Sequence, residues 1–305
     1  MISKLQKRLD FSDKELERIE KEKADVVFDK KIAITVAISV LFTMILSFIY
    51  NDVFVLIVGL TISALLIILG IYLYNKEKNE YSDAIKEIII SGLFKESFSN
   101  VVYQPKKGFD QQFIEATGLY PKGNRFYSND FLSANYKGVG FMQSDILSQQ
   151  VTSNGKTTTT TTLFKGRWFV CDFIKDFDGY HQIRLNNFFK NRKPFKWFDH
   201  LEEFDFEDQS FNEMFTAYTT DQHEAYYLIN PAYMQRLENF VNYVSSEVVF
   251  GFIDNKLHVA IFNNEDAFEV KSLNINENFV KRIDFEISLI KRIIDDLDLQ
   301  LDIFK

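Results

Sequence analysis

The sequence contains a single cysteine, Cys171, among 305 residues. One cysteine cannot form an intrachain disulfide, and it cannot supply the ligands of a cysteine-rich zinc site. Proline is also scarce, with four residues, whereas phenylalanine is abundant, with 32. Together with a hydrophobic content of 46%, this composition excludes a disordered chain and indicates an ordered protein. Cys171 alternates with Phe169 and Phe173, so we expect it to be a buried strand residue rather than a nucleophile.

Basic residues are in deficit, with 35 Lys and Arg against 43 Asp and Glu, and the formal net charge is −8. A generic nucleic-acid-binding protein needs a basic face, so we expect no nucleic-acid partner. The sequence also lacks a phosphate-binding glycine loop, a GxGxxG motif, a GxSxG elbow and an HExxH pair. The motifs therefore assign no catalytic residue, no metal ligand and no cofactor.

Charged residues are missing from two long apolar runs, residues 32–50 and 53–74. As helices these runs would be roughly 28 and 33 Å long, close to the hydrocarbon core of a bilayer at about 30 Å. Only Asn51 and Asp52 separate them, so we predict an antiparallel two-helix transmembrane hairpin; a pair of buried soluble helices is the alternative. The first run follows 31 residues rich in acids, and we expect no cleaved signal peptide.

The distribution of lysine predicts how this hairpin is oriented. The loop between the runs contains no lysine. The lysines that flank the two runs are Lys21, Lys23, Lys30, Lys31, Lys76, Lys78 and Lys86. Positive charge near the ends of spans favours the cytoplasmic side. We therefore expect a multi-pass membrane protein with both termini in the cytoplasm and the lipid bilayer as a partner. The predicted regions are a cytoplasmic amphipathic helix at 1–31, the transmembrane hairpin at 32–74 and a cytoplasmic α+β domain at 75–305.

Small side chains form a stripe along the two runs. Its members recur at a spacing of four residues on each run: Thr35, Ser39, Thr43, Ser47, Gly59 and Ser63. Small residues allow close approach of helices in lipid, so the stripe is a candidate packing face within the hairpin. It is alternatively a face for a homo-oligomer. A polar pore lining has less support, because neither run contains an ionisable residue.

The hydrophobic pattern after residue 74 changes between helical and strand periods. The expected elements, in chain order, are a helix at 75–98, a short helix at 109–117 within an irregular stretch at 101–135, antiparallel strands from 136 to 189, helices at 210–217, 221–229 and 231–246, a hairpin at 247–262 and a helix at 277–299. The dipeptides Asn154-Gly155 and Asp178-Gly179 favour tight hairpin turns between strands. This order predicts an α+β fold with an antiparallel sheet and packed helices.

One acidic segment, DFIKDFDGYHQI, invites a metal or polar-site interpretation. The candidates, with one histidine from further along the chain, are Asp172, Asp176, His181 and His223. A calcium-binding EF-hand alignment fails, because Ile174 and Leu185 would occupy positions that need oxygen ligands. The acids are better explained as turn formers at the tip of a hairpin.

Six consecutive threonines, Thr157–Thr162, follow the Asn154-Gly155 turn signal. A two-residue turn there would pair Ser153 with Lys156 and would make both faces of the ribbon polar. Threonine favours strand geometry without requiring burial. We predict a projecting β-arm whose edges could pair with a strand of a partner. A disordered low-complexity loop is the alternative.

Two segments resemble motifs of a bacterial family catalogued as domain of unknown function 3137: LFKGRWFVCDFIKDFDGYHQIRL and SFNEMFTAYTTDQHEAYYLINPAYMQRL. The matching positions are Phe164, Gly166, Phe173, Phe177, Phe211, Phe215, Tyr218, Asp221, Ala225 and Pro231. The resemblance covers roughly residues 80–299. It implies a protein of the bacterial inner (cytoplasmic) membrane without an established activity, commonly encoded beside LemA-type membrane proteins. It carries over no catalytic residues, and the threonine run is not a family feature.

These observations favour a membrane-tethered cytoplasmic binding or scaffold module that is not an enzyme. A protein partner is expected, and the family suggests a LemA-type protein. One alternative is a membrane-anchored enzyme whose site lies among Asp172, Asp176, His181 and His223. Another is an oligomerising membrane effector, for example in phage defence.

Overall fold

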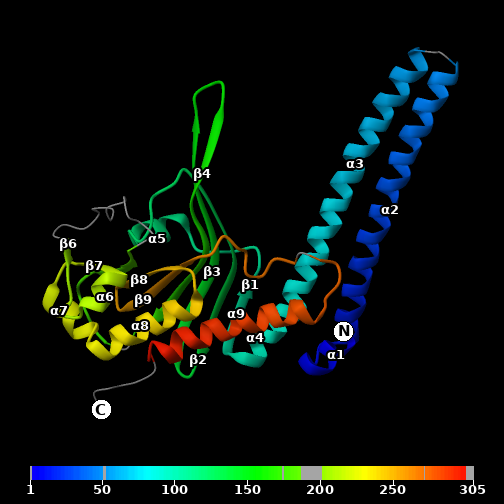
Figure 1. Ribbon diagram of the computed structural model, residues 1–305. Coiled ribbons are helices and arrows are strands. Elements are labelled where there is room, and N and C mark those ends of the chain that lie inside the picture. Colours follow the sequence, from blue (N-terminus) through cyan, green and yellow to red (C-terminus); the bar gives the residue numbers. More distant parts are fainter. Residues whose placement is uncertain (1, 51–52, 174, 187–200, 271, 300–305) are drawn as a thin grey trace. The chain divides into compact units, whose positions relative to one another are not determined.

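The computed structural model describes residues 2–50, 53–173, 175–186, 201–270 and 272–299 (Figure 1). The chain divides into two compact units. The first comprises Met1–Gly92 and Glu269–Phe279, and the second comprises Leu93–Phe268 and Val280–Lys305. The predicted loop of Asn51 and Asp52 lies outside the described residues.

Two long helices that lie side by side dominate the first unit (Figure 1). A short helix α1 (Ile2–Leu9) precedes α2 (Asp13–Tyr50), and α3 (Val53–Ile85) follows. Ser12 and Glu15 form a reciprocal cap at the start of α2: Ser12 N donates to Glu15 Oε2 at 2.7 Å, and Glu15 N donates to Ser12 Oγ at 3.3 Å. This cap satisfies backbone donors that have no partner in the first helical turn. From Asp13 onward, the polar residues and the first apolar run form one continuous helix.

The helical path continues beyond α3 through a π-helix (Lys86–Ile90) and α4 (Ser91–Ser97). The segment Ile57–Ser97 is 41 residues long, and its most apolar window has a mean hydropathy of 2.4. Among the described residues, it is the one helix long and apolar enough to cross a membrane. The apolar part of α2, Ile34–Ile49, is shorter than a helix that could cross a membrane by the same measure.

Nine strands of the described chain form one antiparallel sheet in the second unit, in the order β1-β2-β3-β4-β9-β8-β5-β7-β6. Their bounds are β1 Ser99–Gln104, β2 Arg125–Tyr136, β3 Val139–Ser153, β4 Thr158–Asp172, β5 His181–Leu185, β6 Glu202–Phe204, β7 Phe215–Thr219, β8 Glu247–Ile253 and β9 Lys256–Phe262. The α+β fold with an antiparallel sheet is confirmed.

Helices cover both faces of this sheet. On one face, the segment around α5 (Gln111–Ala116) packs on Trp168, which is fully buried. On the other face lie α8 (Pro231–Val244) and α9 (Glu277–Asp296). The remaining helices are short: α6 (Gln209–Met214) and α7 (Gln222–Leu228). Because side chains alternate along a strand, Arg167 points to the face opposite Trp168, toward α9.

Two predicted elements are wrong. The stretch 101–135, expected to be mostly irregular, contains most of β1 and all but the last residue of β2. Both strands are bulged, and β2 is rich in Ser, Asn and Asp, so neither shows a clean alternating pattern. The helix expected at 210–217 ends at Met214, and β7 begins at the next residue. At residues 215–217, pairing of β7 with the earlier strand β5 overrides the helical pattern.

The hairpin predicted at Asp178-Gly179 is also wrong. The strands before and after it, β4 and β5, are not neighbours, because the β8–β9 hairpin lies between them. The hairpin predicted at 247–262 is confirmed, and its turn residues Asp254 and Asn255 have left-handed φ angles of 49° and 56°. Local turn chemistry thus predicts a bend in the chain, but it does not determine which strands pair.

The threonine run forms a β-arm that projects from the sheet (Figure 1). Its threonines are exposed on both faces, as predicted. The predicted register is wrong: Ser153 pairs with Thr158, and four residues form the turn. The Asn154 side chain explains this wider turn, since its Oδ1 accepts from the backbone N–H groups of Lys156 and Thr157. A bulge between Ser148 and Gln149 shifts the register again at the base of the arm.

Candidate functional site

A buried ion pair lies between the sheet and α9 in the second unit. Arg167 of β4 and Glu286 of α9 approach to 2.6 Å, and their side chains are 4% and 3% exposed. The rest of α9 presents an apolar stripe to the sheet, with Ile283, Ile287 and Ile290 buried. Glu286 occupies the same face of the helix as these isoleucines, which is the sequence signal that marks it as unusual.

The ion pair is only partly satisfied. Arg167 Nε and Glu286 Oε2 are buried without a hydrogen-bond partner among the described residues. Burial raises the pKa of the Glu286 carboxyl to about 7, and the Arg167 guanidinium opposes this rise. A carboxyl with a pKa near neutrality exchanges a proton readily under physiological conditions.

A cavity of about 360 Å³ opens beside the ion pair. It lies entirely within the second unit, and its lining residues are Arg167, Val244, Ser246, Asn263, Glu265, Arg282, Phe285, Glu286 and Leu289. Two guanidinium groups, two carboxylates and an amide converge on this cavity next to apolar side chains. This combination suits a small polar ligand that carries both hydrogen-bond donors and acceptors.

Three carboxylates lie together on the same unit, and Asp145 is the cross-strand neighbour of Arg167. Asp130, Asp145 and Asp266 each offer one oxygen, and these oxygens lie within 4.8 Å of one another. Burial, reinforced by Asp266 and Asp130, raises the pKa of Asp145 well above its usual range. Oxygen-rich clusters of this kind are the ones that could hold a hard cation.

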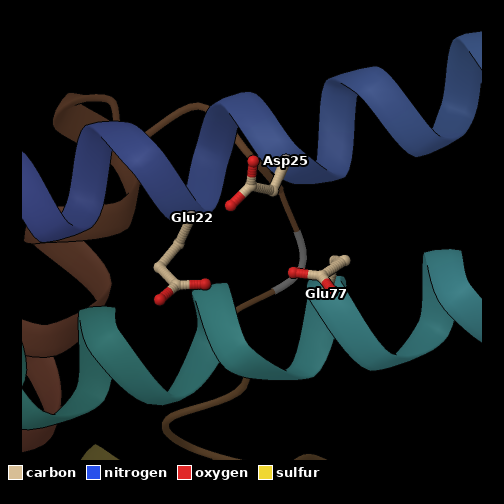
Figure 2. A group of neighbouring side chains, drawn as sticks. All are labelled: Glu22, Asp25 and Glu77. Carbon is tan, nitrogen blue, oxygen red and sulfur yellow. The ribbon is translucent and has the colours of Figure 1, made fainter.

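A second acidic group lies on the helical hairpin of the first unit. Figure 2 shows Glu22 and Asp25 projecting from α2, and Glu77 from α3, with their carboxylates turned toward the space between the helices. All three residues are half-buried. Burial raises the pKa of Glu22, and repulsion from the Glu80 carboxylate raises it further. Because Lys76 Nζ lies 3.5 Å from Glu77 Oε1, an ion-paired, solvated cluster accounts for this group.

Of the polar candidates from the sequence, His181 is part of a buried network. Its Nε2 lies 2.9 Å from Glu224 Oε2 and its Nδ1 lies 2.7 Å from Thr219 Oγ1. Glu224 also accepts from the backbone N–H groups of Asp178 and Gly179. Burial lowers the pKa of His181, and Glu224 opposes this shift. The network fastens the Asp178-Gly179 bend to α7 and satisfies every polar atom of the histidine ring.

The other three candidates are exposed. Asp172 Oδ1 accepts from Lys256 Nζ at 2.8 Å, and Asp176 Oδ1 accepts from Asn255 Nδ2 at 3.4 Å. His223 lies on the exposed side of α7. None of these three residues, and not His181, lines the cavity beside Glu286.

Four members of the small-residue stripe lie at the contact between α2 and α3: Thr43, Ser47, Gly59 and Ser63. Ser47 and Ser63 are buried. A β-carbon added at Gly59 would lie 3.2 Å from Thr43 Cγ2, so the helices are close at this point. Thr35 and Ser39 are exposed, and their hydroxyls donate to the carbonyls of Lys31 and Val36 on their own helix.

The second unit is thus an α+β domain with a polar cavity beneath one helix. Residues 162–299 match the family described as protein of unknown function (DUF3137), which confirms the family that the sequence motifs resemble. No curated protein matches the chain. Among solved structures, the chain is similar to the crystal structure of the mycobacterial trehalose monomycolate transport factor A, TtfA. The TM-score is 0.32 and the identity 8%, and the match covers 65% of this chain and 88% of that chain.

Proposed function

We propose that this protein is a membrane-tethered binding module. The α2–α3 hairpin crosses the inner membrane twice, both ends of the chain lie in the cytoplasm, and the α+β unit binds its ligand or partner there. The observation that carries the proposal is the exposure of large apolar side chains on both long helices.

That exposure is extensive and lies where the charge-free runs are. Phe48 of α2 is 88% exposed, and Phe54 and Leu65 of α3 are 74% and 68% exposed. Apolar surface left in water costs about 25 cal/mol per Å². A bilayer removes this cost without further protein contacts. The lysines at the ends of the runs and their absence from the loop support the proposed orientation.

The binding role rests on the cavity and on the β-arm. In the described structure, β4 pairs with β9 only from Gly166 onward, and β3 pairs with β2 only as far as Gln149. Asn124 bonds the backbone of Val151, and Asn263 and Asn264 bond the carbonyl of Lys165. Beyond these contacts, a partner strand could pair with the edges of the arm. The partner that the family resemblance suggests is a LemA-type membrane protein.

Cysteine accessibility tests the tether and its orientation. In a Cys171→Ala background, single cysteines are placed at Asp52 and at Lys156, which is exposed at the arm tip. A membrane-impermeant maleimide should label Asp52→Cys in intact cells, and Lys156→Cys only after permeabilisation. Labelling of Lys156→Cys in intact cells would reverse the proposed orientation. Release of the protein from membranes by alkaline extraction would exclude the tether.

Glu286 favours a membrane-anchored enzyme as the second candidate function. Its carboxyl has a pKa of about 7 and borders the cavity beside Arg167. A general acid or base works best when its pKa lies near the working pH. This candidate would be favoured if the protein converts a small polar ligand and if Glu286→Gln still binds that ligand but no longer converts it. Binding without conversion would favour the module.

A further inference from the structure

We propose that Asp130, Asp145 and Asp266 form a binding site for a divalent cation that prefers oxygen ligands, such as Ca²⁺, Mg²⁺ or Mn²⁺. The three carboxylates come from three separate segments of the second unit: β2, β3 and the segment that follows β9. Their candidate ligand oxygens lie within 4.8 Å of one another.

The fold brings these residues together through specific local features. The register of β2 against β3 shifts between Asn129 and Leu132, and Asp130 within this bulge has a left-handed φ of 55°. Asn129, next to the bulge, is the cross-strand partner of Asp145. Ala267 N donates to Asp145 Oδ2 at 2.8 Å, which fixes the neighbouring Asp266 against the same place. Three chain segments are thus held at one point before any ion is considered.

Two oxygens of the cluster point to a missing ligand. Asp145 is 4% exposed, and its Oδ1 is buried without a hydrogen-bond partner among the described residues. Asp266 Oδ1 is likewise buried and without a partner there. Buried polar atoms are almost always satisfied in native proteins, by protein, water or an ion. Two such oxygens in one cluster of acids are therefore available to bind a cation.

Arg167, on the strand next to Asp145, does not serve as the positively charged partner of the cluster. Arg167 is the cross-strand neighbour of Asp145. Its guanidinium, however, pairs with Glu286 at 2.6 Å, and no ion pair between Arg167 and Asp145 is found among the described residues. Arg167 and Asp145 thus lie on neighbouring strands, but the guanidinium forms its ion pair with Glu286 and not with Asp145.

Gln143 lies two residues before Asp145 on the same face of β3. It is fully buried, and both its amide oxygen and its amide nitrogen are without partners among the described residues. An amide oxygen belongs to the same class of ligand as the carboxylates. This second unsatisfied side chain extends the buried polar region along the strand.

The ligand set decides the class of ion. It contains oxygen only, with no histidine or cysteine, and such sets suit Ca²⁺, Mg²⁺ and Mn²⁺. Ca²⁺ binds oxygen at about 2.4 Å and Mg²⁺ at about 2.1 Å, so oxygens that all lie within 4.8 Å of one another can contact a single ion of either kind.

Calorimetry on the full-length protein in detergent, after treatment with a chelator, tests the proposal with CaCl₂, MgCl₂ and MnCl₂ as separate titrants. We expect one ion per chain for at least one titrant, with the tightest titrant identifying the preferred ion. Asp145→Asn and Asp266→Asn should each weaken binding by more than about tenfold. Glu77→Gln, in the acidic group of the helical hairpin, is the matched control and should bind as the wild type does.

Thermal melting separates a cation site from a structural role of the same acids. Added cation should raise the melting temperature of the wild type but not of Asp145→Asn. Ion-free Asp145→Asn should melt no lower than the ion-free wild type, because the substitution removes a buried charge. If Asp145→Asn does not fold, Asp266→Asn, whose side chain is half-buried, decides the question. No binding by the wild type, or unchanged binding in both variants, would overturn the proposal.

Discussion

Phenylalanine side chains are treated in opposite ways by the two units of this protein. Phe28, Phe42 and Phe48 are exposed on α2, whereas Phe164 and Phe250 are buried in the sheet unit. The residue type is the same, so the difference lies in what covers the side chain. In the sheet unit other side chains do so, whereas the described residues leave most of the surface of the three α2 phenylalanines uncovered. The two units therefore bury the same residue type to very different extents.

Charged groups show the reverse contrast. On the hairpin, Arg18 and Glu87 form an ion pair in which both side chains are 47% exposed. In the sheet unit, Arg167, Glu286 and Asp145 are buried. Burying charges costs free energy unless they are paired and hydrogen-bonded. The sheet unit retains such groups on the face that α9 covers, and both the cavity and the proposed cation site use them.

A matched pair of phenylalanine substitutions gives the largest expected effect. Phe164→Ala should destabilise the sheet unit by about 3–5 kcal/mol, since it leaves a cavity in the core. Phe48→Ala removes the same atoms from an exposed position on α2. It should change the unfolding free energy of the sheet unit by less than about 0.5 kcal/mol. Denaturant unfolding in detergent, followed by tryptophan fluorescence, measures both. Equal effects of the two substitutions would remove the contrast between the units.

The buried charge of Glu286 should make stability depend on pH. Its folded-state pKa of about 7 lies above the ordinary value of 4.5. Between these values the unfolded state has released the proton and the folded state still holds it, so stability falls as pH rises. The free energy of unfolding should fall by about 3 kcal/mol between pH 4.5 and 7. Below pH 4.5 Glu286 should contribute no such loss.

Glu286→Gln should remove this contribution, so that its stability falls less steeply from pH 4.5 to 7 than that of the wild type. Denaturant unfolding at a series of pH values compares the two slopes. Glu207→Gln is the control, because Glu207 belongs to the same unit and its side chain is exposed. Parallel slopes for wild type and Glu286→Gln would show that this carboxyl ionises normally in the folded protein.

Removal of the β-arm should have the smallest effect. Deleting Gln150–Thr161 and joining Gln149 to Thr162 through Asn-Gly removes ten exposed residues, the half-buried Gln150 and Val151, and the two hydrogen bonds between Asn124 and Val151. The expected cost is about 1 kcal/mol or less.

A deletion that starts two residues earlier is the control for the arm. It also removes Ser148, which is buried and pairs with Phe164, and should cost clearly more. Thermal melting of the two deletions distinguishes them. Unfolding of the shorter deletion would show that the arm belongs to the core.

The sequence by itself determined the features that depend on neighbouring residues. The charge-free runs at 32–50 and 53–74, the β-structure of Thr158–Thr162 and the hairpin at 247–262 follow from composition and local conformational preference. The apolar stripe of α9 likewise follows from its helical period. The family motifs also belong to this class, because they are read directly from the chain.

Only the tertiary structure decided which distant segments meet. The β8–β9 hairpin enters the sheet between β4 and β5, and this pairing brings Asp266 to Asp130 and Asp145. In the same way, Arg167 and Glu286 are far apart in the sequence and meet only because α9 covers that face of the sheet. No local pattern encodes these contacts, since the free energy of strand pairing and burial comes from partners remote along the chain. The site residues therefore emerge from the fold, whereas the apolar character of the hairpin emerges from the sequence.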